Sequence, residues 1–466
     1  MNRSRILLLL ILAVLVGGML RLIGLDRKSI WLDESATAMF ASGTVQEITS
    51  PGGDPHPPLY YLIMHYWSDL GKGEFLLRLP SAIAGILTIP LMYWLVREWS
   101  DERAALVGAW LLALAPMHLW YSQEARMYAL VTFFGVSSTL CYSLALHRKR
   151  PLWWLGWVVA TLLGLYTQYS MFVVVFLQIV LFVPLWRQRG ASTGFLAVSL
   201  VALLVVGALY IPQARRFATQ FLEGGGGGSS WYFMALQQLL DEVGIMVSLD
   251  TLTTLFKVAA VVSVVVLVGV VWTILRRDLS FRFHRWHLIG ATLIYVGLLL
   301  AWVVPRGFSV KRQSVILLPH LLGIIGFLFS RIDNWRRMML IALLVTLPVT
   351  IYVVGFQEQE SWREAVQYVE EREQEGDILL FSAPYVRMPF NYYYDGDLEG
   401  VGLLPEDLPE RLEEAVANHD RVWLVLSHEE YSDPQGKIEQ VLDQDAALVS
   451  ETPFKRIRIR LYDLSR

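Results

Sequence analysis

Long apolar runs separated by short polar segments dominate the first 355 residues. A helix needs roughly 20 mostly apolar residues to cross a bilayer. The first run follows Arg3 and Arg5 and has no small-residue cleavage site, so we expect a retained span and not a removed signal peptide. The pattern predicts a polytopic α-helical membrane protein with about 11 spans, at 6–25, 74–97, 104–121, 127–146, 152–169, 171–186, 194–212, 255–275, 288–304, 313–330 and 338–355.

The pattern changes in the tail of the chain. Helical patterns there alternate with short apolar runs, at 362–375, 377–381, 406–418, 421–426, 434–446 and 454–461. That alternation favours a small α/β domain with a partly parallel sheet. We therefore predict two domains, a transmembrane module at 1–355 and an α/β domain at 356–466.

Composition and charge agree with this division. The chain is 55% hydrophobic and 17% charged, whereas about 25% of an average soluble domain is charged. Residues 356–466 hold 25 Asp and Glu against 11 Lys and Arg, although the whole chain has a net charge of only −3. The single cysteine, Cys141, excludes a disulfide scaffold. An ordinary cytosolic domain and a nucleic-acid partner are not expected.

Basic residues mark alternate connections between the predicted spans. Lys and Arg are enriched in cytoplasmic loops, and they fall here at 97–103, 147–150, 187–189, 276–285 and 331–337. We therefore expect a cytoplasmic N-terminus, an extracytoplasmic α/β domain and a location in the plasma (inner) membrane. The loops at 26–73 and 213–254 would also be external, and Gly224 to Gly228 should make the second loop flexible.

Two adjacent acids follow the first span, in the sequence Ser-Ile-Trp-Leu-Asp33-Glu34-Ser. Neighbouring carboxylates raise each other's pKa, and such pairs occur where a base, a metal or a polar substrate uses them. The alternative is a charge pair that faces water at the start of a helix. The dipeptide alone leaves both interpretations open.

The same loop continues with Gly-Gly-Asp54-Pro-His56-Pro-Pro-Leu-Tyr60-Tyr. Three prolines in four positions predict a rigid extended turn that holds His56 in place. A short amphipathic helix at 59–70 should follow and lie along the membrane surface. The alternative is a loop that only docks on the membrane.

Two further groups of charges fall at predicted external ends of spans. Glu124 and Arg126 lie in the turn between the third and fourth spans, where they could line the mouth of the bundle or snorkel to the interface. Arg306, Lys311 and Arg312 precede the tenth span and depart from the charge rule. Such bases suit a lipid phosphate, or contact with ordinary anionic headgroups.

Four motifs together carry a resemblance to a known family. They are WLDE at 31–34, HPPLYY at 56–61, RLPS at 78–81 and YSQEARMYAL at 121–130. In this order and spacing they resemble the protein O-mannosyltransferase and lipid A aminoarabinose transferase group. These proteins are polytopic GT-C glycosyltransferases, and the subgroup described as RgtA/B/C/D-like is close. The resemblance covers about residues 1–330 and implies a GT-C fold.

The resemblance also implies a reaction. The donor would be a sugar on a polyprenyl phosphate, presented from the membrane lipid, and the acceptor hydroxyl of a glycan, lipid or protein would arrive from the external side. Asp33 would be the general base of an inverting displacement, and Glu34 would orient it. The other residues predicted to bind substrate are Asp54, His56, Tyr60, Arg78, Glu124, Arg126, Lys311 and Arg312. As donors to the leaving phosphate, His56 and Arg126 come from the matching motifs, whereas Lys311 and Arg312 are nominated from their place before the tenth span. The alternative for Arg78 is an anchor of the second span.

The sequence departs from the aminoarabinose transferases at one point. Those proteins have an acid and a lysine before their Pro-Pro, where this chain has Pro55 and His56. Asp54 is therefore given a supporting role, and a divalent metal is left open. Cofactor, donor sugar and acceptor are not assigned.

Two other functions share this architecture. A non-enzymatic flippase or transporter of lipid-linked glycans should place ionisable groups near the bilayer midplane. A glycan polymerase or ligase would be expected to have its chemistry in a larger late loop. The fifth and sixth predicted spans, and most of the others, have no ionisable group near their middle, and the candidate residues lie at the external mouth, which favours the transferase.

Overall fold

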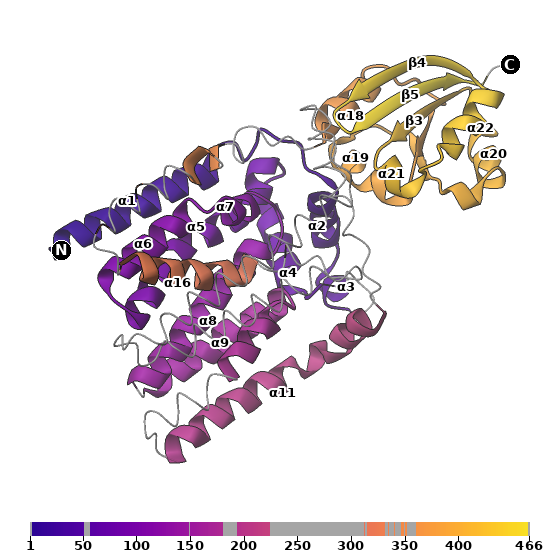
Figure 1. Cartoon of the computed structure of the whole chain (residues 1–466). Coiled ribbons are helices and arrows are strands. Elements are labelled where there is room, and N and C mark those ends of the chain that lie inside the picture. The colour runs from indigo at the N-terminus through magenta and orange to yellow at the C-terminus, as the bar shows by residue number, and fades with distance from the viewer. Residues whose placement is uncertain are drawn as a thin grey trace. The chain divides into compact units, whose positions relative to one another are not determined.

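The computed structural model describes residues 2–50, 56–148, 150–179, 193–223, 312, 315–330, 334, 340, 346–348, 350–351 and 360–464 (Figure 1). The contacts divide the chain into two compact units. The helical unit comprises residues 1–23, 49–60 and 80–354, and the loop–tail unit comprises residues 24–48, 61–79 and 355–466. Part of the first predicted external loop thus groups with the tail. The sequence placed this loop in the transmembrane module at 1–355. The two predicted domains, 1–355 and 356–466, stay a prediction.

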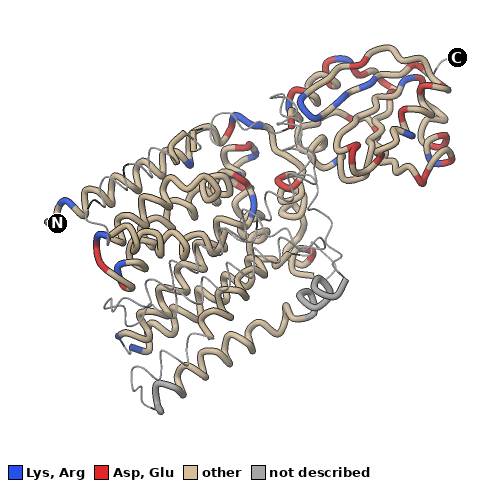
Figure 2. The backbone as a smooth tube through the Cα atoms, in the orientation of Figure 1, with Lys and Arg blue, Asp and Glu red and all other residues tan. Residues whose placement is uncertain are grey.

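The helical unit consists of apolar helices, in agreement with the hydropathy pattern. They are α1 (Arg3–Leu22), α5 (Glu74–Trp99, from residue 80), α6 (Glu102–Ala113), α7 (Pro116–Ser122), α8 (Tyr128–Arg148), α9 (Pro151–Thr167), α11 (Thr193–Glu223), η2 (Val315–Leu317) and α16 (Leu318–Ser330). Figure 2 shows few charged residues along these helices and many over the tail. Such a distribution is that of helices adapted to a bilayer.

Four described helices are long and apolar enough to cross a membrane, at Arg3–Leu22, Glu74–Trp99, Tyr128–Arg148 and Ala197–Ala214. Helices α9 and η2–α16 are apolar but shorter. The predicted spans at 255–275 and 288–304 lie outside the described residues, as do most of 338–355 and part of 171–186. The predicted flexible stretch at 224–228 is outside them too. The number of spans and their orientation therefore stay predictions.

Two close contacts organise the helical unit. Helix α8 packs along α9, and α16 packs along α6. A Cβ atom at Gly326 of α16 would lie 2.8 Å from the backbone oxygen of Ala104 and 2.8 Å from the backbone nitrogen of Gly108. Only glycine permits this approach, which is the small-residue packing that membrane helices use.

A polar cluster joins the helices on the α8 side. The Gln178 side chain accepts a hydrogen bond from Trp157 Nε1 at 2.6 Å and donates to Ser138 Oγ at 3.1 Å. Thr139 of α8 lies 3.1 Å from Nε2 of His320 on α16. Hydrogen bonds of this kind hold apolar helices together where lipid offers no polar partner.

The predicted span at 104–121 is broken. Helices α6 and α7 meet at a 56° bend, and Pro116 opens α7 at a position where its missing N–H is not needed. The bend exposes carbonyl groups at the end of α6, and Arg21 of α1 satisfies them. Its guanidinium donates to the oxygens of Leu112 at 3.1 Å and Ala113 at 3.0 Å.

The fully buried Arg21 also makes two bonds beyond α6. It donates to Gly17 O at 2.7 Å, within its own helix, and lies 2.9 Å from Nδ1 of His118 on α7. A guanidinium can only donate, so Nδ1 of His118 is the acceptor and the imidazole is neutral. Arg21 therefore fastens α1 to both sides of the break.

The loop–tail unit combines the first loop with a mixed sheet. The loop contributes α2 (Leu32–Ser42), α3 (Val45–Thr49, to residue 48), α4 (Leu59–Trp67, from residue 61), η1 (Ser68–Leu70) and the first turn of α5. The predicted helix at 59–70 is thus present as α4 and η1. Tyr61 of α4 packs against Phe40 of α2, with ring centroids 5.7 Å apart.

The tail folds as a five-stranded sheet of order β2-β1-β3-β5-β4. Strand β1 (Ile378–Phe381) pairs in parallel with β2 (Glu399–Gly402) and β3 (Arg421–Leu426), and β5 (Ile457–Asp463) is antiparallel to β3 and β4 (Ala447–Phe454). The partly parallel sheet is as predicted. The apolar run at 454–461 is not one strand, because the chain turns at Lys455 and Arg456 to form a hairpin.

Helices cover both faces of this sheet (Figure 1). Helices α18 (Trp362–Glu370) and α19 (Arg387–Tyr393) contribute to one apolar core, and α20 (Glu410–Val416) and α22 (Lys437–Asp445) contribute to the other. The short elements η3 (Pro384–Val386), η4 (Pro405–Asp407) and α21 (Glu429–Ser432) complete the domain. Alternate residues of β1 and β3 point to opposite cores, as the period of a strand requires.

Replacing Arg21 with Met should destabilise the helical unit. The change leaves two carbonyls and His118 buried without their donor, so we expect the free energy of unfolding to fall by roughly 3 kcal/mol. Arg21→Lys keeps the charge but loses the planar guanidinium, so its free energy of unfolding should lie between those of the parent protein and of Arg21→Met. Thermal unfolding of the purified protein in detergent measures this effect. An Arg21→Met variant as stable as the parent would contradict the role given to Arg21.

Candidate functional site

The two adjacent acids lie in the first turn of α2. Trp31 is extended at the N-cap, and its carbonyl accepts the backbone N–H groups of Glu34 and Ser35 at 3.0 Å each. Asp33 is half-buried and Glu34 is fully buried. The positive end of a helix dipole favours carboxylates at this position. The helix therefore gives the neighbouring acids different surroundings.

Glu34 forms a bidentate ion pair with Arg78 of α5. Nε of Arg78 donates to Oε1 of Glu34 at 2.7 Å, and Nη2 donates to Oε2 at 2.6 Å. Arg78 is 2% exposed and Glu34 is 0% exposed. Both carboxylate oxygens are engaged in this pair, so its geometry fixes the orientation of the Glu34 side chain.

The remaining donors of Arg78 hold the segment before α2. Nη1 donates to the carbonyls of Leu25 at 2.6 Å and Lys28 at 2.8 Å, and Nη2 donates to Ser29 at 3.0 Å. With the two bonds to Glu34, all five N–H groups of the guanidinium have acceptors. Direct contact between Arg78 and a substrate would require one of these bonds to break.

Tyr393 of α19 links the tail to this segment. Its hydroxyl accepts a hydrogen bond from the backbone N–H of Ile30 at 2.7 Å and donates to Oε1 of Glu74 at 2.8 Å. Burial, together with the charge of Glu74, raises the pKa of Tyr393 above its ordinary value. The hydroxyl therefore stays protonated and able to donate to Glu74.

Arg363 of α18 makes a second link. Its side chain donates to Glu74, through Nη2 and through Nε at 3.1 Å, and to the carbonyl of Asp26 at 3.0 Å. Its backbone N–H donates to Ser29 Oγ at 3.2 Å. Helix α19 also packs against α2. The tail thus contacts the same segment that Arg78 holds, at Asp26, Ser29 and Ile30.

Three of the family-like motifs meet in the helical unit. Tyr60, which is fully buried, has its hydroxyl 3.0 Å from Oγ of Ser81, and that oxygen donates to the carbonyl of Arg126 at 3.0 Å. These residues come from HPPLYY, RLPS and YSQEARMYAL. The Tyr60 hydroxyl, predicted to bind substrate, thus lies within hydrogen-bond distance of a protein side chain, Ser81.

Glu124 and Arg126 are both buried, at 4% and 5% exposed. The Glu124 carboxylate accepts a hydrogen bond from Nε1 of Trp120, and the backbone N–H of Arg126 donates to the Glu124 carbonyl at 2.8 Å. His56 is half-buried, beside the buried Pro57. Snorkelling side chains would be exposed, so the burial of Glu124 and Arg126 argues against that interpretation.

The other candidates are only partly covered by the structure. Arg312 is half-buried, and Asp54 and Lys311 lie outside the described residues. Among the residues that the structure does describe, no three His, Cys, Asp or Glu side chains gather as a metal site would require. The question of a metal near Asp54 is therefore untested.

Sequence reasoning missed four residues that hold the loop. Ser29, Glu74, Arg363 and Tyr393 were given no role, although the tail was recognised as a separate α/β domain. Ser81 stood in a motif without a function. The partners Tyr393 and Glu74 are 319 positions apart, and no local pattern signals such a contact.

Comparisons with known proteins agree with the fold. The family of dolichyl-phosphate-mannose-protein mannosyltransferases matches residues 55–211, which contain three of the four motifs but not Trp31 to Glu34. A comparison with curated protein sequences finds no match.

Solved structures match over nearly the whole chain. The crystal structure of ArnT from Cupriavidus metallidurans in the apo state is 16% identical, covers 98% of each chain and has a TM-score of 0.64. The same protein bound to undecaprenyl phosphate has a TM-score of 0.62 at 16% identity, over 99% of this chain and 98% of that one.

A third structure is more distant. The oligosaccharyltransferase of Archaeoglobus fulgidus in the apo form is 12% identical, with a TM-score of 0.58 over 100% of this chain and 75% of its own. At these identities a likeness establishes the fold. The chain therefore has the fold of ArnT and of the archaeal oligosaccharyltransferase, the GT-C fold that its motifs implied.

Proposed function

We propose that this protein is an inverting glycosyltransferase that moves a sugar from a polyprenyl phosphate to an acceptor hydroxyl on the external face of the membrane. The observation that carries the proposal is the ion pair between Glu34 and Arg78, because it gives the two adjacent acids different roles. Glu34 has both oxygens bonded to a guanidinium, and accepting a proton would break that pair. Asp33 is therefore assigned as the base.

The reaction is a single displacement. The acceptor oxygen attacks the anomeric carbon while its proton passes to the Asp33 carboxylate. The bond between that carbon and the phosphate oxygen breaks, and polyprenyl phosphate leaves with the electron pair. Attack from the opposite face inverts the anomeric configuration. A carboxylate is ionised at neutral pH and needs only to be positioned.

The solved relatives support this substrate class. One ArnT structure holds undecaprenyl phosphate, and the archaeal protein is known in complex with an inhibitory peptide and a dolichol-phosphate. This chain shares their fold, and its apolar helices suit a donor that arrives from lipid. We carry the polyprenyl-phosphate donor over as a proposal, and the sugar and the acceptor stay open.

Positive charge is needed where the phosphate leaves. We assign this task to Arg126, Lys311 and Arg312, with His56 as a further donor. Arg78 is better suited to positioning, since its five N–H groups already hold Glu34 and the loop carbonyls. Glu124 and Tyr60 would shape the site, because both are buried and bonded to protein groups.

The tail would serve the same site as a positioning domain. Tyr393 and Arg363 bond to residues 26–30, which lead directly into α2 and Asp33. A base acts efficiently only when held in place, and small displacements are costly. We therefore propose that the tail keeps the loop, and with it the acid pair, in a fixed position.

Asp33→Asn should abolish transfer, with a loss of at least about a hundredfold, because the amide cannot take the acceptor proton. Folding and membrane insertion should be unchanged. The measurement is the formation of glycosylated product from a polyprenyl-phosphate sugar by the purified variant. Asp69→Asn is the matched control, since it makes the same change at an exposed position of the first loop and should leave transfer unchanged.

Two results would contradict this assignment. Full activity of Asp33→Asn would remove it as the base. A wild-type protein that moves lipid-linked sugar between leaflets of a vesicle without making a glycosidic bond would instead be a transporter.

Neutralising Lys311 and Arg312 together as Gln should weaken binding of the donor more than that of the acceptor. The two cations would attract the donor phosphate, and losing them should raise the Kd of the donor about tenfold or more. Equilibrium binding of a labelled polyprenyl-phosphate sugar tests this. Unchanged donor affinity would assign the pair to ordinary headgroups.

Tyr393→Phe should loosen the loop. It removes the bonds to Ile30 and Glu74, and at about 1 kcal/mol for each of the two bonds the transfer rate should fall roughly thirtyfold. Hydrogen exchange at 26–34 should also rise. Tyr394→Phe is the matched control, because its hydroxyl bonds to Glu373 and Leu398 within the tail. If both variants behave alike, the link through Tyr393 does not position the site.

A further inference from the structure

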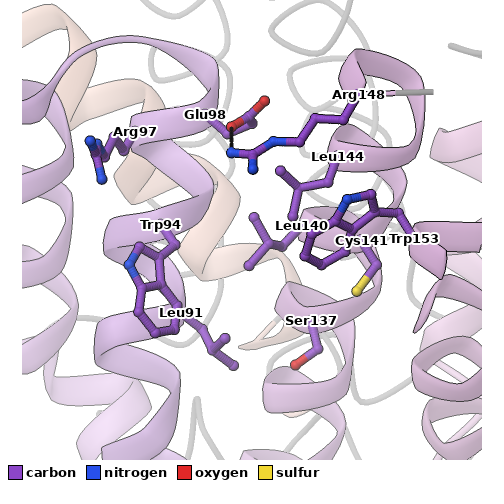
Figure 3. Close-up of a pocket in the computed structure, with 10 residues that line it drawn as sticks. All are labelled: Leu91, Trp94, Arg97, Glu98, Ser137, Leu140, Cys141, Leu144, Arg148 and Trp153. Carbon is purple, nitrogen blue, oxygen red and sulfur yellow. Dashed lines mark ion pairs between the residues drawn. The ribbon is translucent and has the colours of Figure 1, made fainter. Parts of the chain in front are cut away.

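An apolar groove lies in the helical unit, between the ends of α5 and α8 and the start of α9 (Figure 3). Its volume is about 580 Å³, within the roughly 300–1,000 Å³ typical of small-molecule sites. Leu91 and Trp94 of α5, Leu140 and Leu144 of α8, and Trp153 of α9 form its walls. Trp94 is 51% exposed, so one wall faces outward from the described helices.

The groove has the length of an acyl chain in one leaflet. Its lining runs along α8 from Ser137 to Arg148, a rise of about 16 Å and roughly half of a 30 Å hydrocarbon core. In a membrane protein, an apolar groove open to the side is a place for lipid chains, because water gains nothing there. The walls therefore favour an acyl chain as the occupant.

The mouth of the groove carries both signs of charge. In Figure 3, Arg148 reaches from α8 toward Glu98 on α5, with Nη2 of Arg148 3.8 Å from Oε2 of Glu98. Nδ1 of His147 lies 2.6 Å from Oε1 of Glu98. Arg97 also lines the groove and is 3.5 Å from Glu102. Glu102 lies outside the lining but offsets the charge of Arg97, so with Glu98 and Arg148 the four side chains balance and a headgroup with both signs of charge suits this end of the groove.

A headgroup with both charges matches this mouth. A phosphate can accept hydrogen bonds from Arg148 and Arg97, and a primary ammonium can donate to Glu98. The separation of 3.8 Å between Nη2 of Arg148 and Oε2 of Glu98 exceeds a hydrogen bond, so a headgroup can insert between these two atoms while Oε1 of Glu98 keeps its contact with His147. A trimethylammonium group has no N–H to donate, and a glycerol headgroup has no cation.

The groove is distinct from the proposed donor site. Ser81, which bonds to Tyr60 and Arg126, lies near the start of α5, and Glu98 lies near its end. The rise between them is about 25 Å along the helix. The groove therefore opens in the leaflet opposite the Ser81 cluster.

We propose that this groove binds one phospholipid with an ethanolamine headgroup, with one of its two acyl chains along Leu140 and Leu144 and its headgroup between Glu98 and Arg148. The lipid stabilises the ends of α5 and α8 that face the leaflet opposite the Ser81 cluster. This inference does not depend on the proposed reaction.

Native mass spectrometry of the full-length protein from detergent tests the proposal. The protein is offered an equal mixture of phosphatidylethanolamine, phosphatidylcholine and phosphatidylglycerol with identical acyl chains. One phosphatidylethanolamine should be retained with a preference of about fivefold or more, the scale of one charge-assisted hydrogen bond. Leu144→Trp, which fills the groove, should abolish that retention.

Glu98→Gln should remove the preference for phosphatidylethanolamine over phosphatidylcholine and leave transfer activity unchanged. Glu102→Gln is the matched control, since it makes the same change near the same end of the bundle outside the groove lining. It should keep the preference. Equal retention of the three lipids, a preference that survives Glu98→Gln, or displacement by polyprenyl phosphate would each overturn the proposal.

Discussion

The buried guanidinium of Arg78 is the constraint on which the first loop depends. A buried cation is tolerated only when its charge and all its donors are matched. Arg78 meets this demand with Glu34 and with the carbonyls of Leu25, Lys28 and Ser29. One side chain therefore sets the path of the chain into α2 and the orientation of its second acid. Because Asp33 precedes that acid in the same helical turn, its position follows from the same set of bonds.

The tail extends this arrangement from the other side. Glu74 stands one turn before Arg78 on α5 and accepts hydrogen bonds from Tyr393 and Arg363. The start of α5 thus presents the carboxylate of Glu74 to the tail and the guanidinium of Arg78 to the first loop. The mixed sheet has no catalytic residue in this proposal, and its helices α18 and α19 supply the donors that bond to the segment before α2. A domain that looked separable in the sequence is in this way part of the support for the proposed base.

In the helical unit, a second buried arginine, Arg21, also bonds backbone carbonyls. A broken helix in a bilayer exposes carbonyls that lipid cannot satisfy. Arg21 donates to Leu112 and Ala113 at the break before Pro116, and His118 accepts from it across the bend. In both units a buried arginine thus holds backbone carbonyls where a helix ends or a loop begins. Arg21 and Arg78 thus have structural roles, and the cations proposed for a substrate phosphate are Arg126, Lys311 and Arg312.

The sequence by itself determined the apolar helices, the partly parallel sheet of the tail and the motifs of a GT-C fold. These features depend on hydrophobic period, composition and neighbouring residues, which a sequence displays directly. Only the tertiary structure decided that Glu34 pairs with Arg78, that α6 and α7 are separate helices, that the short edge strand β2 exists, and that Tyr393 and Arg363 hold the first loop. The partners in these contacts lie up to 337 positions apart. A hydrogen bond between such distant residues leaves no local pattern in the sequence. A polar side chain that makes such a bond has the same sequence neighbours as one that faces water.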